Sequence, residues 1–400
     1  QVIAVSEVIR RHPGVETLVV GRGSNLLIAD KGFDGVVIVM SPSSTENAVV
    51  VDGDIVEAGG AMLMPVLARR SVGAGRGGLE WCVGIPGTVG GAVRMNAGGH
   101  GADMASSVVE ATVLSLRSGQ IVRVSAEQLG FYFRGSALSN NHVVLSVRMR
   151  TSTQEAATGT AEINAVVSWR REHQPGGRNA GSVFVNPGAG DESAGALIDS
   201  AGLRGFTIGS VSVSEKHANF IQADEGGLAH DVVAVMAEVR RRVYEQHGHQ
   251  LRSEIRLVGF DAEANPQFAD VLSSESDTSV ATIRLEQIIE RIASSESRPD
   301  ASIPLSVLSG SQLPAQDADL SPEVLNELRE AFAKDPTGGI AQPETSRVVI
   351  VDPSIMDIEP LGEVDVTVGA TESSSTRVVI VDEDLRQSTD DDFPADTQSQ

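Results

Sequence analysis

The chain of 400 residues contains a single cysteine, Cys82. A lone thiol excludes an intramolecular disulfide and a metal site built from several thiolates, and it favours a reducing compartment. No segment approaches the roughly 18 consecutive apolar residues of a membrane-spanning helix, and the N-terminal residues carry no secretory pattern. We therefore expect a cytoplasmic protein without a membrane span.

Several common catalytic motifs are missing as well. The chain has no Gly-Lys-Ser/Thr, no Gly-x-Ser-x-Gly and no His-Glu-x-x-His. Their absence argues against a P-loop nucleotide triphosphatase, a serine hydrolase and a zinc peptidase. His217 and His230 have no recognisable ligand spacing, so we expect no metal site.

Charge is distributed unevenly along the chain. Residues 261–400 carry 29 Asp/Glu and 8 Lys/Arg, a net charge of −21 out of −23, which leaves −2 for residues 1–260. This composition predicts an acidic disordered tail behind a globular unit, and it argues against nucleic acid as a partner. The tail is interpreted first as a solvated segment. The alternative is a protein partner that binds one of two features of the tail. One is the repeated Arg-Val-Val-Ile-Val-Asp at 347–352 and 377–382, and the other is the pair of amphipathic stretches at 283–292 and 324–332.

The glycine-rich segment Gly84–Gly98 is the most informative feature. It reads Gly-Ile-Pro-Gly-Thr-Val-Gly-Gly-Ala-Val-Arg-Met-Asn-Ala-Gly. Glycines leave backbone N–H groups uncovered, and such groups bind anionic oxygens when they turn toward one concave side. Pro86 fixes one φ angle, and Thr88–Met95 is expected to form a short helix. A diphosphate is the natural occupant of such a loop.

A second glycine loop, Gly21-Arg22-Gly23-Ser24-Asn25-Leu26-Leu27, follows the apolar run Leu18–Val20. It is not the dinucleotide fingerprint of a Rossmann fold, because Leu26 stands where the third glycine is required. Two such loops, each after a strand-like segment, predict one extended cofactor held from two sides. The alternative is that both are tight turns.

Hydrophobic periodicity predicts most of the secondary structure. Helices are expected over Val2–Arg11, 63–70, Ala194–Ser200 and 228–243, and strands over Thr17–Val20, 36–40, 48–51, 55–58, 108–116, 121–124, 206–213, 218–222 and 255–258. The polar stretch 151–160 predicts a domain boundary. Arg134, Ser182 and Glu254 stand out as polar residues in apolar or glycine-rich settings, although a surface ion pair, a turn hydroxyl and a strand-edge residue are the commoner roles.

Four motifs occur in a characteristic order and spacing. They are the two glycine loops, then Asn-Ala-Gly-Ser-Val-Phe-Val-Asn-Pro at 179–187 and Val-Ser-Glu-Lys-His-Ala-Asn-Phe-Ile at 213–221. Together they resemble the UDP-N-acetylenolpyruvoylglucosamine reductase family over most of residues 1–260. The resemblance implies an α+β protein with an FAD-binding domain of the vanillyl-alcohol-oxidase type in two lobes and an α/β substrate-binding domain. The expected ranges are 1–50 and 51–154 for the lobes, 155–260 for the substrate-binding domain and 261–400 for the tail. A further strand and helix precede Val2 in the family, so we expect the first lobe to be N-terminally incomplete.

The resemblance also implies a reaction. The family uses NADPH and FAD to reduce the enolpyruvyl ether of UDP-N-acetylglucosamine to UDP-N-acetylmuramate, a peptidoglycan precursor. By analogy Arg134 polarises the substrate carboxylate, Ser182 donates a proton and Glu254 assists, while Asn186 contacts substrate. The implied FAD-binding residues are Gly21, Arg22, Gly23, Ser24, Asn25, Leu26, Gly84, Ile85, Pro86, Gly87, Thr88, Gly90, Gly91, Asn96, Ala97 and Gly98.

Two residues depart from the family pattern. Phe133 stands where tyrosine is usual, and Val185 stands where lysine is frequent. Together with the missing N-terminal elements they favour one alternative, a non-catalytic remnant that acts through its acidic tail. A second alternative is another FAD-dependent oxidoreductase of the same fold, against which the motifs at 181–184 and 214–220 argue.

Overall fold

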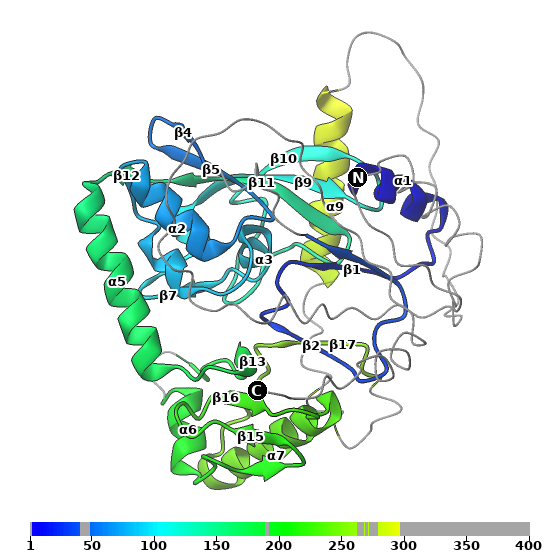
Figure 1. The fold of residues 1–400 in the computed structure, drawn as a ribbon. Helices are drawn as coiled ribbons and strands as arrows, with labels where there is room; N and C mark the ends of the chain where they lie inside the picture. The colour runs from blue at the N-terminus through cyan, green and yellow to red at the C-terminus, as the bar shows by residue number, and fades with distance from the viewer. Residues whose placement is uncertain are drawn as a thin grey trace, which may run out of the picture.

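The structure is a computed structural model that describes residues 2–40, 49–188, 192–261, 268, 271 and 279–296. Its helices and strands form the α+β arrangement that the sequence predicts (Figure 1). The boundaries of the expected domains at residues 50, 154 and 260 stay predictions.

The first part of the chain forms a small α/β unit. Helix α1 (Val2–Arg11) packs its apolar side against the parallel pair of β1 (Thr17–Val20) and β3 (Val36–Val39). β2 (Leu26–Ile28) lies between them in the sequence. The first glycine loop begins at the residue after β1, so a buried strand fixes its starting point.

A second unit is built on a five-stranded sheet. Its order is β10-β9-β11-β5-β4, and every neighbouring pair is antiparallel. The strands are β4 (Val50–Asp52), β5 (Ile55–Gly59), β9 (Val108–Ser115), β10 (Ile121–Ser125) and β11 (His142–Arg150). The predicted hairpin of β9 and β10 is confirmed.

Short elements surround this sheet and carry the second glycine loop. The helices are α2 (Met64–Gly73), η1 (Glu80–Gly84), α3 (Val89–Arg94) and α4 (Met104–Ser107). Three small pairs complete the unit: β6 (Arg76–Gly77) with β12 (Ser152–Thr153), β7 (Gly98–Gly99) with β8 (Ala102–Asp103), and an isolated bridge between Leu63 and Thr88. The glycine loop therefore lies between η1 and β7, with α3 inside it.

Helix α5 (Ala156–His173) leads to the C-terminal unit and runs along the side of the molecule (Figure 1). The polar stretch at 151–160, where a domain boundary is predicted, contains β12 and the first turn of α5. The unit that follows has the sheet order β13-β16-β15-β14 and two helices. Its elements are β13 (Arg178–Ser182), α6 (Ala194–Ser200), β14 (Thr207–Ile208), β15 (Val211–Val213), β16 (Phe220–Ala223), α7 (Ala229–His247) and β17 (Arg256–Val258).

The single strand predicted over 206–213 is wrong. β14 and β15 form an antiparallel hairpin, with Ile208 opposite Val211. Gly209 at the turn has a φ of +59°, a left-handed conformation that glycine adopts without strain.

The last strand joins the C-terminal unit to the first one. β17 pairs in parallel with β2, with Arg256 opposite Leu26. The backbone N–H of Arg256 also donates to the carbonyl oxygen of Asn25 at 2.9 Å. Glu254, two residues before this point, is thereby held beside the first glycine loop.

The expectation of disorder throughout 261–400 is wrong for one segment. Helix α9 (Ser279–Glu296), yellow in Figure 1, lies against β10. Leu285 and Ile289 are fully buried in the core of the second unit. Leu285 and Ile289 are four residues apart, so they lie on one apolar face of the helix, as in a helix that packs on a core rather than in a solvated tail. The repeated motif at 347–352 and 377–382 and the stretch at 324–332 lie outside the described residues.

Candidate active site

A cavity of about 560 Å³ lies where the three units meet. Both glycine loops line it, together with residues of β13 and the approach to β17. All six predicted residues of the first loop, Gly21 to Leu26, face this cavity. The second loop contributes Gly84, Ile85, Pro86, Gly87, Thr88, Gly91, Ala97 and Gly98. The volume is in the range of small-molecule and cofactor pockets.

The two glycine loops touch each other. A methyl group built on Gly21 would overlap the hydroxyl oxygen of Thr88, and one on Gly87 would lie 2.8 Å from Oγ of Ser24. The Ser24 hydroxyl donates to the carbonyl oxygen of Pro86 at 3.2 Å. The absence of side chains at Gly21 and Gly87 therefore allows two distant segments to form one wall of the cavity.

Two predicted cofactor residues, Gly90 and Asn96, do not line the cavity. The N–H of Gly90 donates to the carbonyl oxygen of Gly60 at 2.7 Å, and an added methyl group there would lie 3.2 Å from Val144. Gly90 thus lets α3 pack closely on the sheet. Their direct contact with a cofactor stays a prediction, although both support the loop that makes it.

Asn96 instead connects the second glycine loop to the loop that carries Arg134. It is buried, its Nδ2 donates to the carbonyl oxygen of Tyr132 at 3.0 Å, and its Oδ1 accepts from the N–H of Ala105 at 2.9 Å. This side chain positions the turn in front of Arg134.

Arg134 and Glu254 form an ion pair inside the cavity wall. Nε of Arg134 lies 2.9 Å from Oε1 of Glu254, and Nη2 donates to the carbonyl oxygen of Gly98 at 3.2 Å. Burial raises the pKa of the Glu254 carboxyl, and the charge and hydrogen bond of Arg134 oppose that rise. Arg134 has a φ of +59°, a left-handed conformation that is strained for a long side chain and persists where the surroundings enforce it. The surface ion pair that the local sequence favoured for Arg134 is therefore replaced by a partly buried one.

Ser182 lies at the end of β13 and lines the same cavity. Its chain neighbour Val183 accepts the N–H of Glu254 at 2.8 Å, which brings the two segments together. Gly181, with a φ of +79°, precedes the serine at an irregularity in the pairing of β13 with β16. The fold thus gathers all three predicted catalytic residues at one cavity.

Asn186 is not brought to the cavity. Its Oδ1 accepts the N–H of Ala194 at 3.0 Å, at the start of α6. Its contact with substrate stays a prediction.

Three arginines that the sequence reasoning missed also line the cavity: Arg94, Arg170 and Arg256. With Arg22 and Arg134 they make the wall strongly cationic, as an anionic ligand requires. Arg170 lies in the last turn of α5, where its Nε donates to Oε1 of Gln174 at 2.8 Å, and burial lowers its pKa. Arg94 lies inside the second glycine segment but was not singled out there, and no motif marks Arg170 or Arg256, because they belong to an ordinary helix end and an ordinary strand.

Two further observations concern the part of the chain that the structure describes. No helix in it has the length and apolarity to cross a membrane. Among the same residues, no group of three or more His, Cys, Asp or Glu side chains could hold a metal ion.

Comparison with known proteins gives consistent matches. Residues 1–125 match an FAD binding domain family, and residues 173–258 match the C-terminal domain of UDP-N-acetylenolpyruvoylglucosamine reductase. The reductase of that name from Heliobacterium modesticaldum is 42% identical over 253 residues, 62% of this chain and 79% of that protein. The one from Paramagnetospirillum magneticum is 41% identical over 265 residues, which are 66% of this chain and 84% of that protein.

A solved structure supports the same assignment. The crystal structure of UDP-N-acetylenolpyruvylglucosamine reductase from Thermus caldophilus matches with a TM-score of 0.54 and 32% identity, covering 63% of this chain and 89% of that one. The matched regions contain both glycine loops and the segments of Ser182 and Glu254.

Proposed function

Since this chain belongs to the UDP-N-acetylenolpyruvoylglucosamine reductase family, we propose that its cavity reduces the enolpyruvyl ether of UDP-N-acetylglucosamine to UDP-N-acetylmuramate. NADPH is the reductant, and the product is a peptidoglycan precursor. The observation that carries this proposal is the gathering of Arg134, Ser182 and Glu254 at the cavity that both glycine loops line.

The residues present fit FAD. The cradle of the two loops exists only because Gly21 and Gly87 lack side chains, and its open space adjoins the guanidinium groups of Arg22 and Arg94. Backbone N–H groups of glycine loops and arginine side chains are the donors that a diphosphate requires. These residues would hold FAD, whose flavin would supply the redox chemistry by taking up hydride from NADPH and passing it to the substrate.

The chain's own residues handle the charge and the proton of this reaction. When hydride adds to the methylene carbon of the substrate, negative charge develops on the neighbouring carbon and its carboxylate. Arg134 stabilises that charge, because a guanidinium matches a carboxylate in shape and remains protonated. Ser182 donates a proton to the neighbouring carbon, which completes the addition of two hydrogens across the double bond.

Glu254 orients the arginine. Its Oε1 holds Nε of Arg134, and the carbonyl oxygen of Gly98 holds Nη2, so two acceptors fix the plane of the guanidinium. A guanidinium fixed in advance loses little side-chain entropy when it binds substrate. The raised pKa of Glu254 also suits a carboxyl that relays a proton.

The test separates the two halves of the reaction in the Ser182→Ala variant. Reduction of bound FAD by NADPH should stay near the wild-type rate, while reoxidation by the enolpyruvyl substrate should slow by about 10²- to 10⁴-fold, the usual value of general acid catalysis. Stopped-flow absorbance follows both steps. Equal slowing of the two steps would remove Ser182 from its assigned role.

The rival functions predict different spectra. In a different oxidoreductase of this fold, the flavin absorbance would be bleached by NADPH and would stay bleached when the enolpyruvyl ether is added. A remnant would be colourless as purified. Mass spectrometry of UDP-N-acetylmuramate, formed from the enolpyruvyl ether with NADPH, distinguishes both from the proposed function.

A cytoplasmic location remains part of the proposal. It is supported by the lone thiol of Cys82, because a single cysteine forms no disulfide within the chain. This thiol is also buried, and burial raises its pKa. A protein partner of the acidic residues beyond 296 also stays a prediction.

A further inference from the structure

Helix α9 is seated on the second unit by apolar and polar contacts together. Leu285 and Ile289 are fully buried in the same core as Leu129, Ala137 and Leu138. The Thr282 hydroxyl donates to the carbonyl oxygen of Ala137 at 3.1 Å. The helix therefore contacts the segment that follows Arg134.

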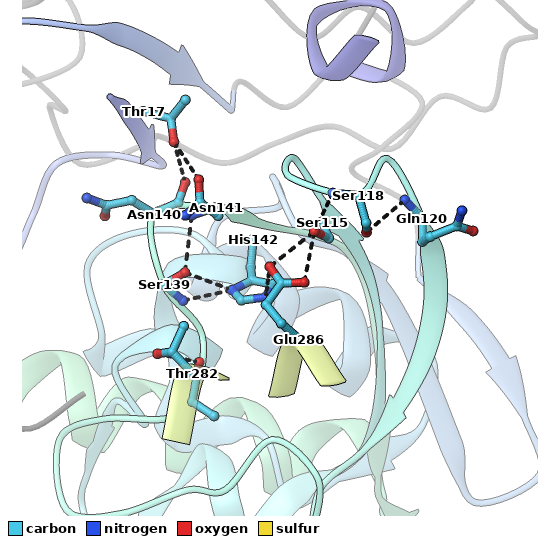
Figure 2. A network of polar contacts seen from close by, with 11 residues as sticks. Thr17, Ser115, Ser118, Gln120, Ser139, Asn140, Asn141, His142, Thr282 and Glu286 are labelled. Atoms are coloured by element: carbon cyan, nitrogen blue, oxygen red, sulfur yellow. Dashed lines mark hydrogen bonds and ion pairs between the residues drawn. The ribbon is translucent and has the colours of Figure 1, made fainter. Parts of the chain in front are cut away.

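Glu286 is the polar centre of this contact (Figure 2). Its Oε1 lies 3.1 Å from Nε2 of His142, whose side chain is completely buried. The Ser115 hydroxyl lies 3.1 Å from both carboxylate oxygens. The carboxylate thus joins the ends of β9 and β11.

The surroundings of His142 define its protonation. Nδ1 accepts the backbone N–H of Ser139 at 3.0 Å, and a backbone N–H can only donate. The ring proton therefore belongs on Nε2, which lies 3.1 Å from Oε1 of Glu286. Without this carboxylate, a buried ring N–H would lose its acceptor, which is costly in a protein interior.

The segment that His142 and Ala137 hold begins at Arg134 and contacts Arg94 of α3. Arg134 lies three residues before Ala137 in the chain. Oδ1 of Asn140 accepts from Nη2 of Arg94 at 2.6 Å, and the Ser136 hydroxyl donates to the carbonyl oxygen of Arg94 at 2.8 Å. Both Arg94 and Arg134 line the cavity.

We infer that α9 is a positioning element of the active site: Glu286, acting through His142, holds the segment from Arg134 to His142 so that Arg134 and Arg94 face the cavity. α9 lies outside the matched ranges 1–125 and 173–258, so this chain brings support for its active site from its C-terminal extension. Asn96 holds the front of the same segment through Tyr132, and α9 holds its end. The inference relies on the proposed function only for the reaction that Arg134 serves.

The experiment compares three variants of the full chain. Glu286→Ala removes the acceptor of His142, Glu286→Gln keeps an oxygen that accepts the same hydrogen bonds, and Glu290→Ala is the control on the exposed side of α9. Hydrogen exchange of the backbone amides of residues 134–142 is measured by mass spectrometry. Loss of a hydrogen bond to a charged group predicts at least about tenfold faster exchange in Glu286→Ala, with most of the protection retained in Glu286→Gln and all of it in Glu290→Ala.

A kinetic readout accompanies the exchange measurement. In Glu286→Ala, assayed at saturating FAD because Arg94 also lines the cofactor cavity, the KM of the enolpyruvyl substrate should rise, while reduction of bound FAD by NADPH stays unchanged, because Arg134 serves only the second step. If the substrate reaction is absent in the wild type as well, the proposed function fails and the exchange result still decides the inference.

Two outcomes would overturn the inference. One is faster exchange in α9 alone, with residues 134–142 as protected as in the wild type. The other is an equal effect of Glu286→Ala and Glu290→Ala. Should Glu286→Ala fail to fold, Thr282→Val removes the bond to Ala137 at nearly constant volume, and faster exchange in residues 134–142 is again the required result.

Discussion

Replacement of Gly21 by alanine tests whether the two glycine loops must touch. Gly21 has no left-handed φ, so alanine is compatible with its backbone and any effect comes from the added methyl group. That group would overlap Oγ1 of Thr88 and lie 3.0 Å from its Cγ2. Thr88 is buried, so the overlap cannot be relieved by a turn of the side chain toward solvent.

The size of the effect follows from the packing. Overpacking of a tightly packed site costs about 1–3 kcal/mol. If the loops separate to relieve it, the cost is paid in cofactor binding, and the Kd of FAD should rise by about 5- to 150-fold. Gly14→Ala is the control, because a methyl group there meets nothing within 4 Å and the residue has no left-handed φ.

A second substitution identifies the cause. Thr88→Ala removes both clashing atoms and leaves Cβ at 3.2 Å, which is tight. Alone it also loses the bond from the Gly91 N–H to the Thr88 hydroxyl, an N-cap worth about 0.5–2 kcal/mol. The double variant should therefore bind FAD more tightly than the sum of the two single losses predicts.

The assay is titration of the apoprotein with FAD, followed by flavin fluorescence, for the four variants and the wild type. Additive losses in the double variant would show that the clash with Thr88 is not the cause. An FAD affinity of Gly21→Ala equal to that of Gly14→Ala would refute the close approach of the two loops.

Two further predictions concern carboxylates. Glu254→Gln keeps an oxygen for Nε of Arg134 but cannot ionise. Because the pKa of Glu254 is raised, the wild-type rate should fall as pH drops through a range above that of ordinary carboxyls. This acid limb should be absent from the pH–rate profile of the variant. For Glu286, burial would raise the pKa, but the hydrogen bonds from His142 and Ser115 and the charge of Arg117 lower it overall. Its contribution to stability is therefore present at neutral pH and lost as pH falls below about 4. The difference in Tm between the wild type and Glu286→Ala should shrink across that range. Thermal unfolding followed by circular dichroism measures it.

Local sequence was sufficient for the parts of the site that depend on local backbone. The two glycine loops carry their conformation in their own residues. The first follows the short apolar strand β1, as predicted, but the expected strand before the second is wrong, because the 3-10 helix η1 stands there. The elements α1, α6 and α7 were also predicted, because their apolar residues recur at helical spacing. The placement of the C-terminal unit against the first unit follows from the parallel pairing of β2 with β17, which no local pattern encodes.

The missed residues have a common physical reason. Arg94, Arg170 and Arg256 reach the cavity from a helix, a helix end and a strand, where arginine is ordinary on any surface. Only the three-dimensional arrangement brings them to one cavity. Asn96 was predicted to bind a cofactor, and that contact stays a prediction; in the structure its amide donates to the carbonyl oxygen of Tyr132 and so braces a loop, a role that no local pattern indicates.

The disorder that charge predicted for the whole of 261–400 fails in α9 for a related reason. Net charge is averaged over a long range, whereas a helix docks through a few residues of one face. Residues 279–296 lie within the acidic part, yet Leu285 and Ile289 are buried and the acidic Glu286 faces two donors, Ser115 and His142. Residues 297–400 still carry 21 Asp/Glu against 6 Lys/Arg, a net charge of −15. α9 therefore belongs with the core of the second unit although its residues lie in the acidic part of the chain, and a chain cut at Asp261 would lack Glu286, the carboxylate beside His142.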